Sequence, residues 1–342
     1  MINDIVLESN SPSEPALLVL PRIRVQNANA ISSPLTWGFP AMSAFLGMMT
    51  ALERRLGANA GIVFRAVGVV CHSFEAQVTT QGYTRAFQLT RNPVLADGST
   101  AGIVEEGRVH LEVTLVFDVL VSSAHIGDSQ RQVLAEQISH MVAGMRVAGG
   151  SVMPPLPTAQ RQPPRPTLEL VSQQLDQEDE RRQQFRRLSR RWLPGFALVS
   201  RDDLLQSRLT ELQVGSPDAT TLDAWLDLSR WNHRTVQVPN EQGELFTTWV
   251  TDPRAGWTVP IPVGYAGLSE LHQPGTVTNA RDMLTPFRFV ESIWSIGQWI
   301  SPHRLRGLDD LLWYSQVEGD DNSLYRCRND YASMPPADLA SN

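Results

Sequence analysis

The sequence predicts an α+β protein in which a β-α-β-β-α-β unit is followed by a mostly helical second half. Three segments, over residues 16–25, 62–78 and 109–119, place their apolar residues on alternate positions that share one face, as strands do. Two others space their apolar residues as helices with one buried face do, over residues 41–56 and after Asp128. With a fourth strand after the second helix, the order is the ferredoxin-like arrangement.

The first strand and the first helix are joined by an unusually long connection, residues 25–40. Such connections usually take about 2–6 residues. Its amides and hydroxyls suit base edges and phosphate oxygens, and its Trp ring offers a stacking surface. The alternative is an ordered loop whose Asn and Ser side chains bond their own backbone. The candidate RNA contacts in it are Asn27, Asn29, Ser32, Ser33 and Trp37.

Between the second and third strands, residues 83–107 break the alternation with turn sequences, which predicts an excursion from the sheet, such as a hairpin. Arg91 precedes Asn92-Pro93 there, so its guanidinium would sit on a rigid turn. A clamp over a nucleic-acid strand needs such a group; the alternative is a turn on a flexible hairpin.

The second helix is expected to begin at Asp128-Ser129, a good N-cap pair. Arg146, Gly149 and Gly150 then belong to a glycine-bearing fourth strand. Its glycines fit close approach of the backbone to an RNA, or a bulge. The helices would cover one face of the sheet and leave the other free for a partner.

We place a first domain at residues 1–153, a proline-rich linker at 154–167 and a helical domain at 168–342. In the second domain a capping box, Ser200-x-x-Asp203, predicts a helix start. Short strands are expected at 196–200 and 257–263, and weak strands in a loop at 232–255. The predicted helices cover residues 167–192, 220–231, 286–300 and 303–317.

Arginines crowd the first of these helices. A row of this kind can neutralise phosphates; the alternative is a solvated helix partly offset by acidic residues one or two turns earlier. The six are Arg181, Arg182, Arg186, Arg187, Arg190 and Arg191.

The chain of 342 residues has a net charge of −7 and contains no Lys. This acidic balance disfavours a free-standing, non-specific nucleic-acid binder, so any such contact must be local or shared with basic subunits. No apolar window is long enough to cross a membrane, and the first residues do not resemble a secretory signal. With only Cys71 and Cys327, we expect a cytoplasmic protein.

The residue pattern predicts neither a catalytic nor a metal site: we find no Ser-His-Asp order, metal-ligand spacing or phosphate loop. His72 could act as a general base, but it shares a face with apolar residues and is better interpreted as a core or interface residue. His110 and Glu112 could form an acid–base pair, or bond across the sheet with Arg22 or Arg24. The aromatic motifs of a standard RNA-recognition module are absent.

Several long motifs resemble the family of second subunits of the type I-F CRISPR surveillance assembly, the Csy complex. They are QNANAISSPLTWGFP at 26–40, LTRNP at 89–93, DGSTAGIVEEGRVHLEV at 97–113, WLPGFALVSR at 192–201, VPIPVGY at 259–265, NARDMLTPFRFVE at 279–291, SPHR at 301–304 and LWY at 312–314. The match spans nearly the whole chain.

The resemblance implies a non-catalytic member of the RAMP superfamily that pairs with the large subunit and binds the 5′ handle of the CRISPR RNA. It implies a thumb-like hairpin, placed at residues 83–107, that meets the backbone subunit. Target DNA is a further partner it allows; no cofactor or membrane is implied. Arg281 completes the candidate RNA contacts. Two rival hypotheses are a metal-independent endoribonuclease acting on repeat RNA and a scaffold that touches only protein.

Overall fold

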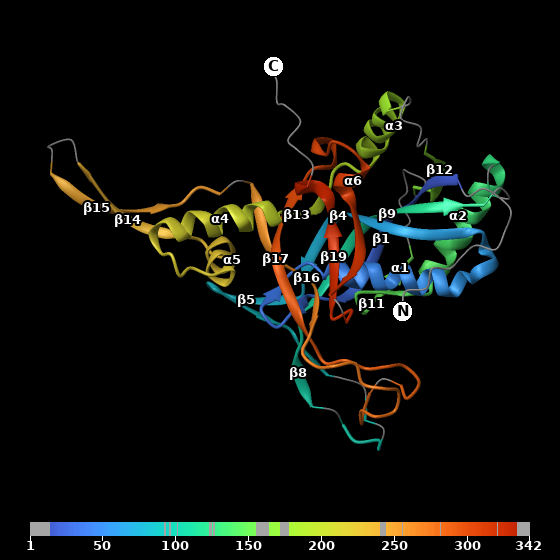
Figure 1. Ribbon diagram of the computed structural model, residues 1–342, viewed down its shortest axis with the longest axis horizontal. Helices are drawn as coiled ribbons and strands as arrows, with labels where there is room; N and C mark the ends of the chain where they lie inside the picture. Colours follow the sequence, from blue (N-terminus) through green and yellow to red (C-terminus); the bar gives the residue numbers. More distant parts are fainter. Residues whose placement is uncertain are drawn as a thin grey trace.

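A computed structural model describes residues 14–91, 94–95, 97–100, 102–122, 125, 127–154, 164–171, 178–239, 244–254, 256–280, 282–319 and 321–333 (Figure 1). Within these residues the fold is α+β, with one eleven-stranded antiparallel sheet and six α-helices. None of the helices in this part of the chain is long and apolar enough to cross a membrane.

The first half contributes strands β11, β1, β9 and β4, hydrogen-bonded in that order. Their bounds are β1 Glu14–Asn29, β4 Ile62–Ala76, β9 Arg108–Val121 and β11 Gly150–Met153. The three alternating segments and the first helix are therefore confirmed as elements. Helices α1 (Met42–Leu56) and α2 (Asp128–Ala143) cover one face, where Phe45 and Ile138 join the same core as Leu18. The N-cap of α2 is Gly127, without a side-chain cap, rather than the expected Asp128-Ser129 pair.

The opposite face of the sheet is covered as well, so the expectation of a free face is wrong there. Leu17 and Val19 of β1 pack against Phe185 and Leu188 of α3 (Glu178–Arg191). The physical reason lies in β1 itself: its residues 16–20 are apolar without a break, as in strands buried on both faces.

The second half continues the same sheet and closes it into a ring. Strand β13 pairs with β4 at Cys71, and β18 pairs with the same edge of β4 at Gly68. From β13 the order runs β17, β16, β19 and β18, which returns to β4. The bounds are β12 Thr167–Leu170, β13 Phe196–Ser200, β16 Trp257–Gly267, β17 Val290–Ile300, β18 Leu312–Glu318 and β19 Leu324–Asn329.

The expected mostly helical second half is therefore wrong. The segment at 286–300 contains β17, and 303–317 contains only the short helix α6 (Leu308–Leu311) before β18. Ile293, Ile296 and Ile300 repeat at intervals that also suit a helix face, and a short apolar run does not separate the two structures by periodicity. The β-branched and aromatic side chains of 290–300 favour the strand that forms. Likewise, the predicted helix at 167–192 begins as β12, which pairs with β1.

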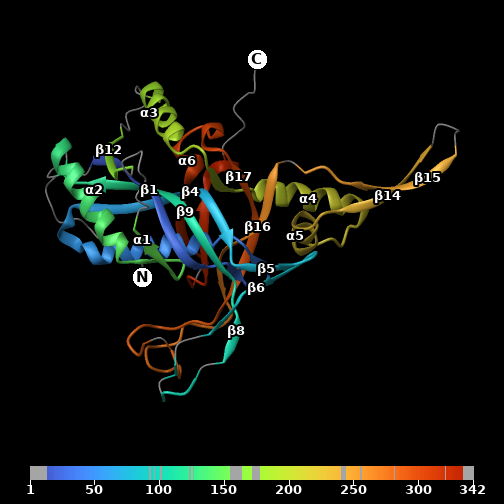
Figure 2. The same ribbon diagram turned by 180° about the vertical axis from the view of Figure 1, so that it is seen from behind.

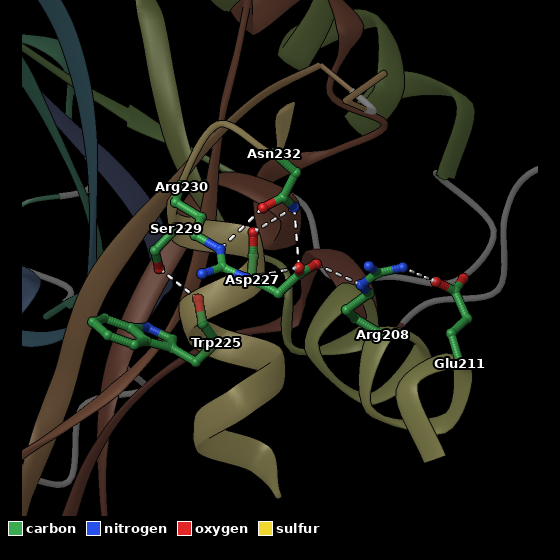
Figure 3. Close-up of polar contacts among 7 residues, drawn as sticks. All are labelled: Arg208, Glu211, Trp225, Asp227, Ser229, Arg230 and Asn232. Carbon is green, nitrogen blue, oxygen red and sulfur yellow. Dashed lines mark hydrogen bonds and ion pairs between the residues drawn. The ribbon is translucent and has the colours of Figure 1, made fainter. Parts of the chain in front are cut away.

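Two helices and a long hairpin form a lateral extension (Figure 1). The helices are α4 (Asp202–Gly215) and α5 (Thr221–Ser229), and the hairpin, in the predicted region of weak strands, is β14 (His233–Pro239) with β15 (Leu245–Thr251). Figure 3 shows Asp227 accepting hydrogen bonds from Arg208 at 2.6 Å and Asn232 at 3.0 Å. This carboxylate fixes α4 and α5 to the point where the hairpin leaves the body.

The capping box predicted at Ser200-x-x-Asp203 does not form. Helix α4 has Arg201 as N-cap without a side-chain cap, because Asp203 instead binds the Arg201 guanidinium at 2.8 Å. A complete capping box forms at α5, where Thr220 and Asp223 bond each other reciprocally.

The excursion after β4 is present and starts at residue 78, earlier than predicted. It consists of two successive hairpins, and its tip projects from the body on the side opposite α3 (Figures 1 and 2). The hairpins are β5 (Val78–Gln81) with β6 (Thr84–Phe87) and β7 (Leu89–Arg91) with β8 (Ile103–Glu105). Asn92 and Pro93 lie outside the described residues.

Candidate functional site

A pocket of about 620 Å³ lies where the end of β1, the start of α1 and the turn after β10 (Arg146–Val147) meet. We call it the α1 pocket. It brings together three of the predicted contacts, Asn29, Ser32 and Gly149. The remaining lining residues are Pro40, Ala41, Ser43, Ala44, Ala148, Tyr265 and Tyr325.

The first turn of α1 makes this pocket suitable for an anion. Ala41 is the N-cap and provides no side-chain hydrogen bond, and the first turn contains no acidic residue. The first N–H groups of a helix lack intrahelical partners and carry the positive end of the helix dipole. Together they form a ready site for a phosphate.

The turn between β10 and β11 forms the opposite wall. Ala148 and Gly149 have positive φ angles of 48° and 77°, and the Ala148 carbonyl accepts a hydrogen bond from the Asn29 N–H at 2.8 Å. Gly150 allows β11 to approach β1, because a Cβ there would lie 2.7 Å from the Ala28 nitrogen. The predicted glycine-bearing strand is therefore a tight hairpin, and Gly150 has a packing role.

Two tyrosines complete the pocket from the second half of the chain. Their ring centroids are 6.3 Å apart. Burial raises the pKa of Tyr325 to about 12, so its hydroxyl stays uncharged even at moderately alkaline pH. Sequence reasoning missed both; the one signal was the position of Tyr265 at the end of the VPIPVGY motif.

The side chains of the β1–α1 connection mostly bond their own loop, as the turn-forming alternative proposed. Strand β1 extends to Asn29, and a small hairpin follows, β2 (Ile31–Ser33) with β3 (Thr36–Trp37). The Asn29 side chain donates to the Ile31 carbonyl at 2.7 Å and accepts from the Ile31 N–H at 3.0 Å. Ser32 lies 2.9 Å from the Thr36 hydroxyl.

Ser33 is buried and accepts a hydrogen bond from the Trp294 indole at 2.8 Å. It therefore attaches the β2–β3 hairpin to β17, and its burial argues against its predicted contact with RNA. Asn27 is exposed, with a φ of 57°, and its N–H donates to His110 Nδ1 at 3.1 Å.

The remaining predicted contacts are scattered. Arg146 is exposed beside the α1 pocket, and its guanidinium donates to the Gly149 carbonyl at 3.3 Å. Trp37 is 58 % exposed and lines a second, largely apolar pocket with Phe74, Phe196 and Trp257. The backbone of Arg91 lies in β7, but its side chain is outside the described residues, as is all of Arg281.

The possible catalytic groups are bonded within the protein. Glu112 accepts from Arg22 at 2.8 Å, which confirms bonding across the sheet. His72 Nδ1 lies 2.7 Å from the Pro194 carbonyl, so it carries the proton, and Nε2 accepts from the Thr114 hydroxyl at 2.8 Å. Among the residues that the structure describes, we find no cluster of three metal-ligating side chains.

We expect the free energy of unfolding to decrease at acidic pH because His72 becomes protonated. Burial lowers its pKa below the ordinary value of 6.5, and the nearby Arg22 lowers it further, against the opposing effects of the Pro194 carbonyl and Glu112. The unfolded chain then binds the proton more readily, so this stability is complete above about pH 6.5 and is lost below it.

The measurement is urea denaturation between about pH 5 and 7.5. Replacing His72 by Gln should flatten this part of the pH dependence, whereas the same change at the exposed His303 should leave it intact. An identical acid slope in the wild-type and His72→Gln proteins would contradict the prediction.

Comparison with known proteins finds similarity over nearly the whole chain. The family model described as CRISPR-associated protein (Cas_Csy2) matches residues 18–327. The chain is also 50 % identical, over 316 residues, to the CRISPR-associated protein Csy2 of Pseudomonas aeruginosa strain UCBPP-PA14. That alignment covers 91 % of this chain and 94 % of the relative.

Proposed function

Because this chain belongs to the Csy2 family of CRISPR-associated proteins, we propose that it is a non-catalytic subunit of the type I-F CRISPR surveillance assembly. In this role it binds the 5′ handle of the CRISPR RNA and pairs with the large subunit, which helps to assemble the complex for target DNA recognition in antiviral defence. The protein recognises the shape and the backbone of the guide RNA, whereas base pairing between guide and target determines the target sequence.

The α1 pocket is the observation that carries this proposal. It joins an uncapped helix N-terminus, a turn with two positive φ angles and two tyrosines. Helix N-termini and such turns bind phosphates, and aromatic rings stack on unpaired bases. A pocket with both kinds of group suits a single-stranded RNA end, and it needs no overall positive charge.

The fold offers further support. The strand order β11-β1-β9-β4, with α1 and α2 on one face, agrees with a ferredoxin-like domain of RAMP type. We assign the β5–β8 hairpins to the thumb and the thumb to the contact with the backbone subunit. The loop at 268–289 extends to the same side as the thumb (Figures 1 and 2), and we retain its Arg281 as an RNA contact.

The rival proposal, a metal-independent endoribonuclease, requires a histidine that can reach the RNA backbone. His72 has both ring nitrogens bonded inside the protein, and His110 accepts from the Asn27 N–H. Neither arrangement favours proton transfer to a ligand. Incubation with repeat RNA decides between the two: a cleavage product that disappears on His72→Ala or His110→Ala would overturn the non-catalytic proposal.

Changing both Asn27 and Asn29 to Ala is expected to weaken handle binding about tenfold. The change removes the Asn29 amide, which orders Ile31 beside the α1 pocket, and the exposed Asn27 amide two residues earlier. A tenfold loss corresponds to about 1.4 kcal/mol, the contribution of one or two hydrogen bonds.

Binding is measured with the purified subunit pair and a labelled handle RNA. The matched control is Asn59→Ala. Asn59 is exposed in the short turn that follows the C-terminus of α1, at the other end of the helix from the pocket. Equal affinity of the double variant and the wild type would remove these two residues from the site. Failure of the wild-type pair to prefer handle RNA over an unrelated RNA would reject the proposed function itself.

A further inference from the structure

Helix α3 buries one side and presents arginines on the other. Phe185 and Leu188 pack in the core below it. Arg186 and Arg190 are exposed on its outer surface. At a rise of about 1.5 Å per residue, these two lie about 6 Å apart along the helix axis. The row predicted along this helix, Arg182, Arg186 and Arg190, therefore lies on its exposed side.

The arginines of α3 fall into two groups. Arg187 and Arg191 bind Glu169 of β12, at 2.8 and 3.4 Å, so their charge is partly neutralised. Arg186 and Arg190 form no ion pair within the described part of the chain. Unneutralised neighbouring cations repel each other, and in a chain of net charge −7 they concentrate positive potential at one place.

A third exposed arginine lies close to α3. Arg304, in the 3-10 turn Pro302–Arg304, is exposed and likewise has no ion pair among the described residues. The turn lies beside α3, because the adjacent Leu305 packs in the same cluster as Phe185 and Leu188. Arg186, Arg190 and Arg304 together are called the α3 surface below.

The chemistry of this surface selects one class of ligand. Arginine forks bind phosphate oxygens bidentately. Proteins that hold single strands also need aromatic rings for base stacking, but Phe185 and Trp192 are buried. The α3 surface therefore offers phosphate contacts without stacking, which suits the outer backbone of a duplex.

We infer that the α3 surface binds the phosphate backbone of duplex DNA, at a site separate from the α1 pocket. Helices α1 and α3 pack on opposite faces of the sheet, α1 in the core that contains Leu18 and α3 against Leu17 and Val19 (Figures 1 and 2). A duplex on α3 can therefore be held while a single strand occupies the α1 pocket. The inference rests on the charges and packing of α3 and does not depend on the proposed role of that pocket.

The test uses the protein with whatever subunits and RNA purify with it. The probe is a fluorescent DNA duplex of about 30 base pairs and arbitrary sequence, with binding followed by anisotropy between about 50 and 200 mM salt. The variant Arg186→Gln/Arg190→Gln should bind on the order of thirtyfold more weakly near physiological salt. The slope of log affinity against log salt should fall by about 0.9 for each lost contact, and Arg304→Gln should remove one further contact.

The matched control is Arg54→Gln/Arg55→Gln, an equal charge change at two exposed arginines in the last turn of α1. It should leave affinity and slope nearly unchanged, and both variants should keep their RNA and partner subunits. An unaltered slope in the α3 variant, or an equal loss in the control, would overturn the inference. So would loss of a co-purifying subunit or of RNA, since α3 would then serve that contact instead.

Discussion

Replacing Ser43 by Glu is expected to reduce RNA binding roughly a hundredfold while leaving the fold at least as stable as before. Ser43 is the second residue of α1 and lines the α1 pocket. A carboxylate at this position would repel the RNA phosphate that we propose to bind there, and placing like charges together costs several kcal/mol of binding free energy. The same carboxylate interacts favourably with the helix dipole, which adds about 0.3–1 kcal/mol to stability.

This combination separates binding from folding, because a merely damaged protein would lose both. RNA affinity is measured by filter binding, and the free energy of unfolding by urea denaturation. The matched control is Ser43→Gln, which has similar size but no charge and should lose far less affinity. If Ser43→Glu bound RNA as well as Ser43→Gln does, the α1 N-terminus would not be the phosphate site.

Replacing Asn329 by Leu is expected to destabilise the fold by about 4 kcal/mol. Asn329 is buried at the end of β19 and makes three hydrogen bonds, each at 2.9 Å. Its amide donates to the carbonyls of Asp310 and Leu312, and its oxygen accepts from the Ser200 N–H. A leucine leaves all three groups buried without a partner, at about 1–3 kcal/mol each.

The effect is read as a shift of the urea midpoint. The matched control is Asn59→Leu at an exposed position, where surface substitutions usually stay within about 0.5 kcal/mol. Similar midpoints for the two variants would mean that Asn329 does not hold β13, β18 and β19 together.

The sequence predicted the first half of the fold well, for a physical reason. Strand β9 alternates cleanly, and α1 has one apolar stripe, so local periodicity identifies each element. The sequence of strand β17 has no such clear periodicity. The strand belongs to a closed ring of strands whose pairings join residues far apart in the chain, such as Gly264 with Arg326. Those partners decide its structure, and a local pattern does not contain them.

The candidate site divides in the same way. Asn29, Ser32 and Gly149 were predicted from local chemistry and do line the α1 pocket. Tyr265 and Tyr325 reach the pocket only because β16 pairs with β19. The sequence near either residue does not indicate this pairing. Ser33 was misleading for the opposite reason, because its hydroxyl has a structural partner 261 residues away in Trp294.

The shared edge of β4 has a consequence for any attempt to express the two halves separately. In the whole protein that edge is occupied by β13 and β18. A fragment ending in the proline-rich segment would expose it as an unpaired, apolar strand edge, which invites aggregation. The halves should therefore become soluble only when produced together, as mutually dependent pieces of one structure.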